Sequence, residues 1–568
     1  MFCTGCGKNA KEGWKFCKYC GGTLEDEPQE EQVSVEPEMA APVTTPQPEQ
    51  PAPVQPPQPP IAAPPQPEQP APVQPPQPSM AAPAPPAQPS WTVPPPPGVA
   101  GMPSAPDLSK GKPWVKPLII GGVALAVIAA VILVLVFTVF SGGSKAEPYV
   151  KEAEALLEEQ EYEQALEKAE LAVDADPKYA PAYCVRARAY NGLEQYEQAL
   201  DDADQAVELD PGYSEAYRAR GRAYHGLKEY EKAITEFDRA IELDPRNDKA
   251  CSNRGDARFN LGRYEEAVED YSRAIELDPD DASDFASRAD AYFWLDRFEE
   301  AVDDYSQAIE LDPAYAYAYV WRGTAYNRLG QFDQAVADST KALELDPESA
   351  IACRERGTAY NELGQYQSAL DDLKLAISLD PEDPWSYAQR ALAYFQVGMY
   401  YEGITDSTKA IELNPELVWP YNLRGICYNE LGQYDKAVPD LDKALELDPE
   451  YQAAYNNRGA AYNGLKQYDR AMTDLNKALE LDPDDPKAYM NRGNSYKGLG
   501  QKDLAMADYN KAIQLDPTLA KAYYNRGQLY RELGQPEQAV ADLKKAVELK
   551  PDYEDAKQAL REMSIPGY

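Results

Sequence analysis

Histidine is nearly absent from this chain of 568 residues, which contains only His225. The sequence also has no nucleophile paired with a base, no GxxxxGK phosphate loop and no GxGxxG segment after a strand. The acidic run 278–284 lacks the loop spacing of an EF-hand, so a helix-end turn explains it better than a calcium site. These absences argue against an enzyme, and we expect no catalytic residues.

Basic residues are scarce relative to acidic ones. Lysine and arginine number 55 against 95 aspartates and glutamates, which gives a net charge of -40. Nearly all of the excess lies after residue 145. A field of this sign repels nucleic acid and anionic headgroups and favours basic or cationic partners, although it also serves solubility alone. Nucleic acid is therefore not an expected partner.

Cysteine is rare as well, and the eight residues fall into two groups. One group is scattered singly along the C-terminal part: Cys184, Cys251, Cys353 and Cys427. Because this group has no disulfide spacing, we expect small buried or groove-lining apolar side chains there.

The second group lies within the first twenty-two residues, as CxxC, ten residues and CxxC: Cys3, Cys6, Cys17 and Cys20. Two cysteines separated by two residues direct both sulfurs at one cation from a tight turn, which Gly7 and Gly21 permit. Four thiolates complete a tetrahedron and leave no position for water. The spacing therefore predicts a structural metal whose binding supplies the folding free energy of this short segment.

Residues 1–24 resemble the short zinc ribbon found at the N-terminus of many bacterial membrane proteins, which implies one structural zinc ion. Iron, as in rubredoxin, is the alternative metal. Two disulfides are the alternative without a metal, which a reducing cytoplasm disfavours. Four lysines make this head mildly basic, too few to predict nucleic-acid binding: Lys8, Lys11, Lys15 and Lys18.

Residues 25–117 are rich in proline, glutamine and alanine, and the run PQPEQPAPVQPPQP occurs twice there. Such a composition cannot form a core and favours extended polyproline II, so we predict a disordered spacer. A docking site for a proline-reading groove is the alternative.

One long hydrophobic run follows, at residues 118–140, and it is long enough to cross a bilayer as a helix. It lies too far from the N-terminus for a secretory signal peptide. Three lysines precede it, against Lys145 and then acidic residues after it: Lys110, Lys112 and Lys116. The positive-inside bias predicts a cytoplasmic N-terminus, with the part after the short linker 141–145 outside the cytoplasm. Unpaired cysteines oppose this placement weakly.

A small-residue stripe in the same run, Gly122, Ala126 and Ala130, would let two such helices pack together. Small residues are common in any membrane helix, so self-association stays open.

Proline recurs every 34 residues, without an insertion, from Pro177 to Pro551. Alanine stands five residues before each of these twelve prolines, and twelve residues before each, with Gly403 as the one exception. Within 214–247, helical spacing predicts two helices, and the pair Asp244–Pro245 predicts the end of the second. Each unit is thus a predicted helix hairpin.

Residues 146–553 resemble twelve consecutive tetratricopeptide repeats. The resemblance implies an all-α right-handed superhelix whose first helices line a concave groove. The segment Glu554–Met563, within the tail 554–568, is amphipathic and predicts a capping helix.

Arginine recurs at one first-helix position in eleven repeats, and an acid stands sixteen residues after each. The pairs run from Arg186 and Asp202 to Arg526 and Asp542. In the first repeat both signs are reversed, to Glu152 and Lys168. This joint reversal predicts an ion pair across the hairpin in preference to an anion-binding ladder.

Large apolar residues gather at variable first-helix positions in the middle of the array. By analogy with the family, these positions face the groove, and aromatic anchors in a concave patch are typical of peptide recognition. Packing against neighbouring helices is the alternative. The predicted groove residues are Phe259, Phe293, Trp294, Tyr317, Val320, Trp385, Leu392, Phe395, Trp419 and Ile426.

Together these features predict a membrane-anchored scaffold that binds peptide or protein partners outside the cytoplasm, in a bacterial plasma membrane by analogy. The alternative is a membrane sensor or regulator, in which the ribbon contacts nucleic acid or a cytoplasmic enzyme while the array receives a signal.

Overall fold

The computed structural model describes residues 144–566. The predicted zinc ribbon 1–24 with its four cysteines, the linker 25–117 and the transmembrane helix 118–140 lie outside these residues and stay predictions. Among the helices of residues 144–566, none is both long and apolar enough to cross a membrane.

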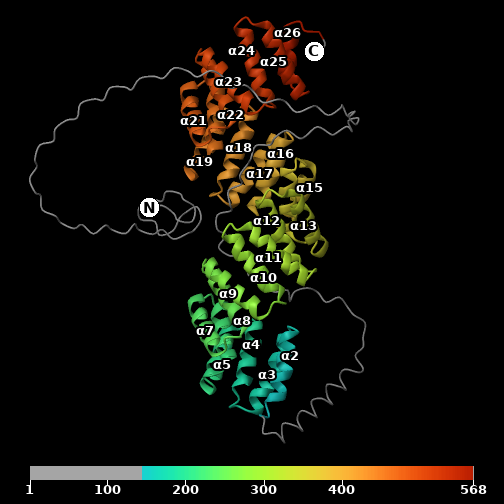
Figure 1. Cartoon of the computed structure of the whole chain (residues 1–568), viewed down its shortest axis with the longest axis vertical. Helices are drawn as coiled ribbons and strands as arrows, with labels where there is room; N and C mark the ends of the chain where they lie inside the picture. The colour runs from blue at the N-terminus through green and yellow to red at the C-terminus, as the bar shows by residue number, and fades with distance from the viewer. Residues whose placement is uncertain (1–143, 567–568) are drawn as a thin grey trace, which may run out of the picture. The chain divides into compact units, whose positions relative to one another are not determined.

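Residues 144–566 form helices and no strand, which confirms the all-α prediction for this part of the chain. Twelve helix hairpins follow one another and a single helix ends the series (Figure 1). The first helices are α2 (Glu147–Glu158), α4 (Ala180–Gly192), α6 (Ser214–Gly226), α8 (Asp248–Asn260), α10 (Ala282–Trp294), α12 (Ala316–Arg328), α14 (Ala350–Glu362), α16 (Pro384–Gln396), α18 (Val418–Glu430), α20 (Gln452–Gly464), α22 (Pro486–Gly498) and α24 (Ala520–Glu532). The second helices are α3 (Tyr162–Ala175), α5 (Tyr196–Leu209), α7 (Tyr230–Leu243), α9 (Tyr264–Leu277), α11 (Phe298–Leu311), α13 (Phe332–Leu345), α15 (Tyr366–Leu379), α17 (Tyr400–Leu413), α19 (Tyr434–Leu447), α21 (Tyr468–Leu481), α23 (Lys502–Leu515) and α25 (Pro536–Leu549).

The second helices end where the recurring proline forces them to. Asp244 is extended, with φ −134° and ψ 94°, because the residue before a proline avoids the α region. Its Oδ1 accepts a hydrogen bond from the backbone N–H of Arg246 at 3.0 Å, which closes the turn into the next hairpin. The predicted stop in repeat 214–247 is therefore confirmed.

The turn inside each hairpin contains one residue with positive φ. Glycine occupies this position in seven hairpins, as at Gly262 with φ 75°. Other residues occupy it in five: Gln160, Glu194, Lys228, Asp296 and Lys466. Glycine adopts this conformation freely, whereas each of these five residues is strained by about 1 kcal/mol.

The two helices of a hairpin fit by matching residue size at one crossing point. A Cβ on Gly357 of α14 would lie 2.7 Å from Cγ of Leu373 in α15. At the corresponding positions of the second hairpin stand Ala187 and Ala203, and both are fully buried. These two hairpins thus fill the crossing differently, with a glycine beside a leucine in one and with two alanines in the other.

Every predicted ion pair across a hairpin is present, with distances of 2.6–2.8 Å for the eleven arginines. The reversed pair of the first repeat, Lys168 and Glu152, lies at 2.6 Å. The arginines are therefore structural, as predicted.

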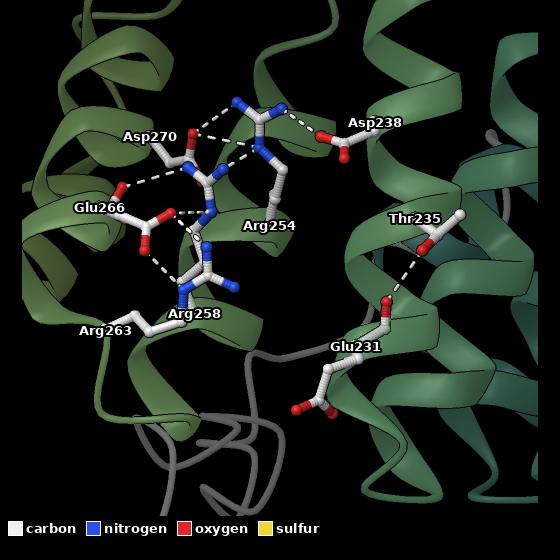
Figure 2. Close-up of polar contacts among 8 residues, drawn as sticks. All are labelled: Glu231, Thr235, Asp238, Arg254, Arg258, Arg263, Glu266 and Asp270. Atoms are coloured by element: carbon white, nitrogen blue, oxygen red, sulfur yellow. Dashed lines mark hydrogen bonds and ion pairs between the residues drawn. The ribbon is translucent and has the colours of Figure 1, made fainter. Parts of the chain in front are cut away.

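Most of these arginines also hold the preceding hairpin. In Figure 2, Arg254 of α8 donates from Nη2 to Asp270 of α9 and from Nη1 to Asp238 of α7, each at 2.6 Å. Nine of the eleven arginines reach a second-helix side chain of the preceding hairpin in this way. One guanidinium thus joins three helices.

The last helix, α26 (Glu554–Glu562), covers the end of the array. Its Ala556, Ala559 and Leu560 are buried in one cluster with Leu543 and Ala546 of α25. The predicted cap is confirmed.

Candidate functional site: a cleft along the first helices

The ten predicted groove residues divide into two sets. Six are partly exposed: Phe259, Phe293, Trp294, Tyr317, Trp385 and Phe395. Four are buried: Val320, Leu392, Trp419 and Ile426.

The buried set fills the space between consecutive first helices. Leu392, Trp419 and Ile426 share one core cluster of α16 and α18, and Trp419 is only 2% exposed. Val320 packs with Ala352 of the next first helix. The expectation that these four face the groove is therefore corrected, because a side chain enclosed by two helices offers no surface to a partner.

Several of the partly exposed aromatics pack against other aromatic side chains of the array. Trp294 stacks on Tyr264 of the preceding hairpin, with ring centroids 6.0 Å apart. Phe293 meets Trp321 edge to face at 5.6 Å. Their outer surfaces stay candidates for partner contact, a role that remains a prediction.

A cleft of about 540 Å³ runs along the first helices of the second to fifth hairpins and reaches α12. Side chains of α4, α6, α8 and α10 line it, together with Tyr317 of α12. Of the ten predicted residues, only Phe259 and Tyr317 lie in this cleft.

Two aspartates on the wall of the cleft accept hydrogen bonds from core tyrosines. Asp290 accepts from Tyr305 at 2.5 Å and from Tyr317 at 2.8 Å. Asp256 accepts from Tyr271 at 2.8 Å. A tyrosine buried in the hairpin core requires an acceptor, and these aspartates supply it.

A third aspartate, Asp284, accepts a hydrogen bond from Ser252 Oγ at 2.5 Å. Burial raises the pKa of Asp284 to about 7, and it raises the pKa of Asp290 to about 7 against the opposing effect of its hydroxyl donors. Burial also raises the pKa of Asp256. Neutral and charged forms of Asp284 and Asp290 are thus both accessible near neutral pH.

Basic groups enter the cleft mainly from α6. Arg218 is held by Glu215, whose Oε2 lies 3.0 Å from its Nε. Lys249 Nζ of α8 lies 3.9 Å from Asp281. Burial raises the pKa of Asp256 against the opposing positive charge of Arg222, whereas burial lowers the pKa of His225 and the charge of Arg222 adds to that lowering.

The single histidine, His225, is partly buried. Its Nε2 lies 3.3 Å from Asn260 Nδ2, and its ring meets Tyr230 edge to face. Burial is the main cause that lowers the pKa of His225. Nothing in this arrangement pairs it with a nucleophile.

Asparagines at one first-helix position join consecutive first helices. Each donates from Nδ2 to a backbone carbonyl 28 residues later, at 2.7–3.0 Å: Asn191, Asn327, Asn361, Asn429 and Asn463. The Oδ1 atoms of the first four are buried without a hydrogen-bond partner. Because three of these four asparagines lie outside the cleft, the unpaired oxygen is a feature of the repeat and not of the cleft alone.

Metal chemistry finds no support in the array. Within residues 144–566, no group of three or more histidine, cysteine or acidic side chains is arranged to hold a metal ion. The four cysteines described are buried, as predicted, and burial raises the pKa of the thiols of Cys184 and Cys427 to about 12. They stay neutral and unreactive at ordinary pH.

Comparison with protein families agrees with this architecture. Tetratricopeptide repeat models match residues 180–213, 248–281, 316–349, 386–417, 418–451, 453–485, 486–519 and 520–553, and a TPR repeat model matches 221–262, 289–330 and 357–398. Together these matches cover more than half of the chain. This chain belongs to the tetratricopeptide repeat family. Its TPR repeats imply a protein–protein interaction scaffold.

Solved TPR-like structures resemble the array at low identity. A chain of the APC/C hetero-tetramer Cut9–Hcn1 is 17% identical over 74% of this chain and 96% of its own, with a TM-score of 0.45. A tetratricopeptide repeat protein from Parabacteroides merdae is 24% identical over 43% of this chain and 97% of its own, with a TM-score of 0.38. MamA is 24% identical over 30% and 94%, with a TM-score of 0.29. Among curated proteins none matches this sequence.

The carboxyls of the TPR cleft were missed at the level of sequence, although a signal for them exists. Tyrosine replaces the usual small or aliphatic residue at Tyr271 and Tyr305, and an aspartate stands fifteen residues before each. A core tyrosine needs a polar partner, so this spacing would have identified Asp256 and Asp290.

Proposed function

We propose that this TPR protein is a membrane-anchored scaffold, without catalytic activity, that holds a peptide or protein partner in the cleft along its first helices. One observation carries the proposal: side chains of four consecutive first helices, together with Tyr317 of α12, line one continuous cleft of about 540 Å³, which is large enough for several side chains of a partner.

The membrane and zinc parts of the proposal rest on the sequence. The apolar run 118–140 supports a single transmembrane helix, and the lysines before it support a cytoplasmic N-terminus. Cys3, Cys6, Cys17 and Cys20 support a structural zinc ion in the head. In this arrangement the array lies outside the cytoplasm and the head inside it.

Photo-crosslinking in the producing cells tests the scaffold function. A photoreactive residue at Ser287, which lines the cleft, is expected to give polypeptide adducts with the full-length protein. The same residue at Glu269, an exposed site on α9 outside the cleft, serves as the matched control. Equal adduct yields at the two sites, or none at Ser287, would remove the support for a binding cleft.

A further inference from the structure

Two carboxylates of the cleft differ from every other buried acid in the described part of the chain. Asp284 is 3% exposed and Asp290 is 8% exposed, yet neither makes an ion pair with any residue of 144–566. The other buried acids all pair with arginine: Asp202, Asp270, Asp304, Asp338, Glu355, Asp372, Asp406, Asp440, Asp474, Asp508 and Asp542. A buried carboxylate without a cation is costly, so these two are exceptions that need a reason.

The hydroxyl groups that donate to these two carboxylates fix their positions but leave some of their hydrogen-bond acceptor sites unoccupied. An ionised carboxylate offers about four acceptor sites. Asp284 receives one hydrogen bond, from Ser252, and Asp290 receives two, from Tyr305 and Tyr317. Both therefore keep room for further donors.

Two asparagines that line the same cleft have a side-chain oxygen that accepts no hydrogen bond. Asn191 is 8% exposed, and its Oδ1 has no hydrogen-bond partner, although its Nδ2 is used by Ala219. Asn253 Oδ1 is likewise buried and unpartnered. Both residues line the cleft. The unpaired polar atoms of these two lining residues are thus acceptors, and they are enclosed by protein beneath the surface of the cleft.

The basic groups of the cleft do not meet these needs. Arg218 is engaged by Glu215 and Lys249 lies beside Asp281. Arg222 and His225 belong to α6. Their charges act on Asp256, where they oppose the rise in pKa that burial causes. Glu194 is the remaining acid of the lining.

We infer that the part of the cleft lined by Asp284 and Asp290 receives lysine or arginine side chains from a partner polypeptide. This inference rests on the proposed scaffold function and names the chemistry of the partner. An ammonium or guanidinium group brings several N–H donors and the missing positive charge at once. The strongly negative charge of the array would draw such a segment toward the cleft.

Binding of this kind is linked to protons. Because burial raises the pKa of Asp284 and Asp290 to about 7, a cation that requires the ionised carboxylates displaces protons below that pH. Tyr317 stays protonated, since burial raises its pKa well above the ordinary value. Affinity for a basic segment is therefore expected to rise as pH increases through about 7.

The first test uses the full-length protein and a fluorescent peptide that alternates lysine and serine. D284N/D290N is expected to weaken binding about tenfold or more at pH 8, the range of a charge-assisted hydrogen bond, and to abolish the pH dependence. The variant should fold, because Asn494 already accepts the hydroxyl of Tyr509 in the place that Asp290 has for Tyr305. D201N/E208Q removes two exposed acids of α5 and is the matched control for net charge. Equal losses in both variants would overturn the inference.

The second test separates this inference from the scaffold function. With the photoreactive residue at Ser287, D284N/D290N is expected to abolish the adducts in cells while D201N/E208Q keeps them. Adducts that persist in D284N/D290N would overturn the role of the two aspartates and leave the scaffold function standing. Absence of adducts in the unmodified cleft would remove both.

Discussion

At the scale of single residues, the array depends on polar groups that are buried only together with a partner. The arginines of the ion pairs are partly buried, as for Arg356, whose side chain is 20% exposed against 12% for Asp372. Because both charges lose water, the pair contributes through geometry and hydrogen bonding more than a surface pair would. The sequence was sufficient to predict these pairs, since the reversal at Glu152 and Lys168 revealed which positions meet.

Breaking one pair should destabilise its hairpin. D372A leaves the Arg356 guanidinium with only Thr340 on the preceding hairpin, and we expect a loss of about 2 kcal/mol, between the values for exposed and buried pairs. Urea unfolding and hydrogen exchange of the α14 and α15 amides would measure it. The double reversal R356E/D372K copies the first repeat and should recover part of the loss; no recovery would contradict a direct pair.

Burial of the Asp290 carboxyl, against the opposing effect of its hydroxyl donors, gives the array a pH-dependent element. The folded-state pKa of Asp290 is raised from 3.8 to about 7, so its stabilising contribution is present below the unfolded pKa and is lost as pH rises through about 7. D290N keeps an acceptor without a charge. Relative to the unmodified protein, its free energy of unfolding should therefore increase between about pH 4 and pH 7, by at most ~1.4 kcal/mol per pH unit.

The reciprocal change supplies the control. N494D places a carboxyl beside Tyr509 at the corresponding position of α22, which is partly buried, and should introduce a pH dependence of the same sign there. If urea unfolding of D290N and N494D shows no opposite trends with pH, burial of the carboxyl is not the cause.

At the scale of helices, the period of the sequence determines where elements begin and end, but not which neighbour a side chain faces. The recurring prolines and alanines place all twelve hairpins correctly from sequence. Trp419 and Leu392 were placed in the groove because their positions vary, yet they lie between α16 and α18. Variable positions of a first helix point either to the groove or to the next first helix. The rotation of the helix about its own axis decides between the two, and this rotation is set by packing against the neighbouring helices.

The fit between the two helices of a hairpin can be tested by a substitution that adds a methyl group and a second substitution that compensates for it. G357A forces a methyl group toward Leu373 and should cost about 1–3 kcal/mol, as overpacking usually does. G357A/L373A copies the Ala187 and Ala203 pair of the second hairpin. The double variant should lose less than the sum of G357A and L373A in urea unfolding, and strict additivity would contradict the proposed contact.

At the scale of the whole molecule, the chain joins the helical array to an N-terminal region with a predicted zinc ribbon, linker and transmembrane helix. Placement of the array outside the cytoplasm depends on three lysines before the apolar run. The net charge of -40 is compatible with either side of a membrane.

Protease added to intact cells or spheroplasts would decide this placement. With one epitope tag at Met1 and another after Tyr568, we expect loss of the C-terminal tag alone, because the array would be exposed while the head is enclosed. Lysed cells, in which both tags should be lost, provide the control. Protection of the C-terminal tag with loss of the N-terminal tag would reverse the orientation and remove the reducing environment on which the zinc prediction depends.

The uninterrupted 34-residue spacing has a consequence for how the number of repeats in the gene can change. Because each junction repeats the same alanines, the same turn and, in most hairpins, the same arginine bridge to the preceding one, the ends left by excising one unit are natural neighbours. Removal of residues 350–383 would join Ser349, a helix N-cap, to Pro384, the first residue of the next first helix. Unequal crossing-over between repeats within the gene would therefore yield folded proteins of eleven or thirteen units, so the length of the binding surface can change in a single genetic event while its ends are preserved.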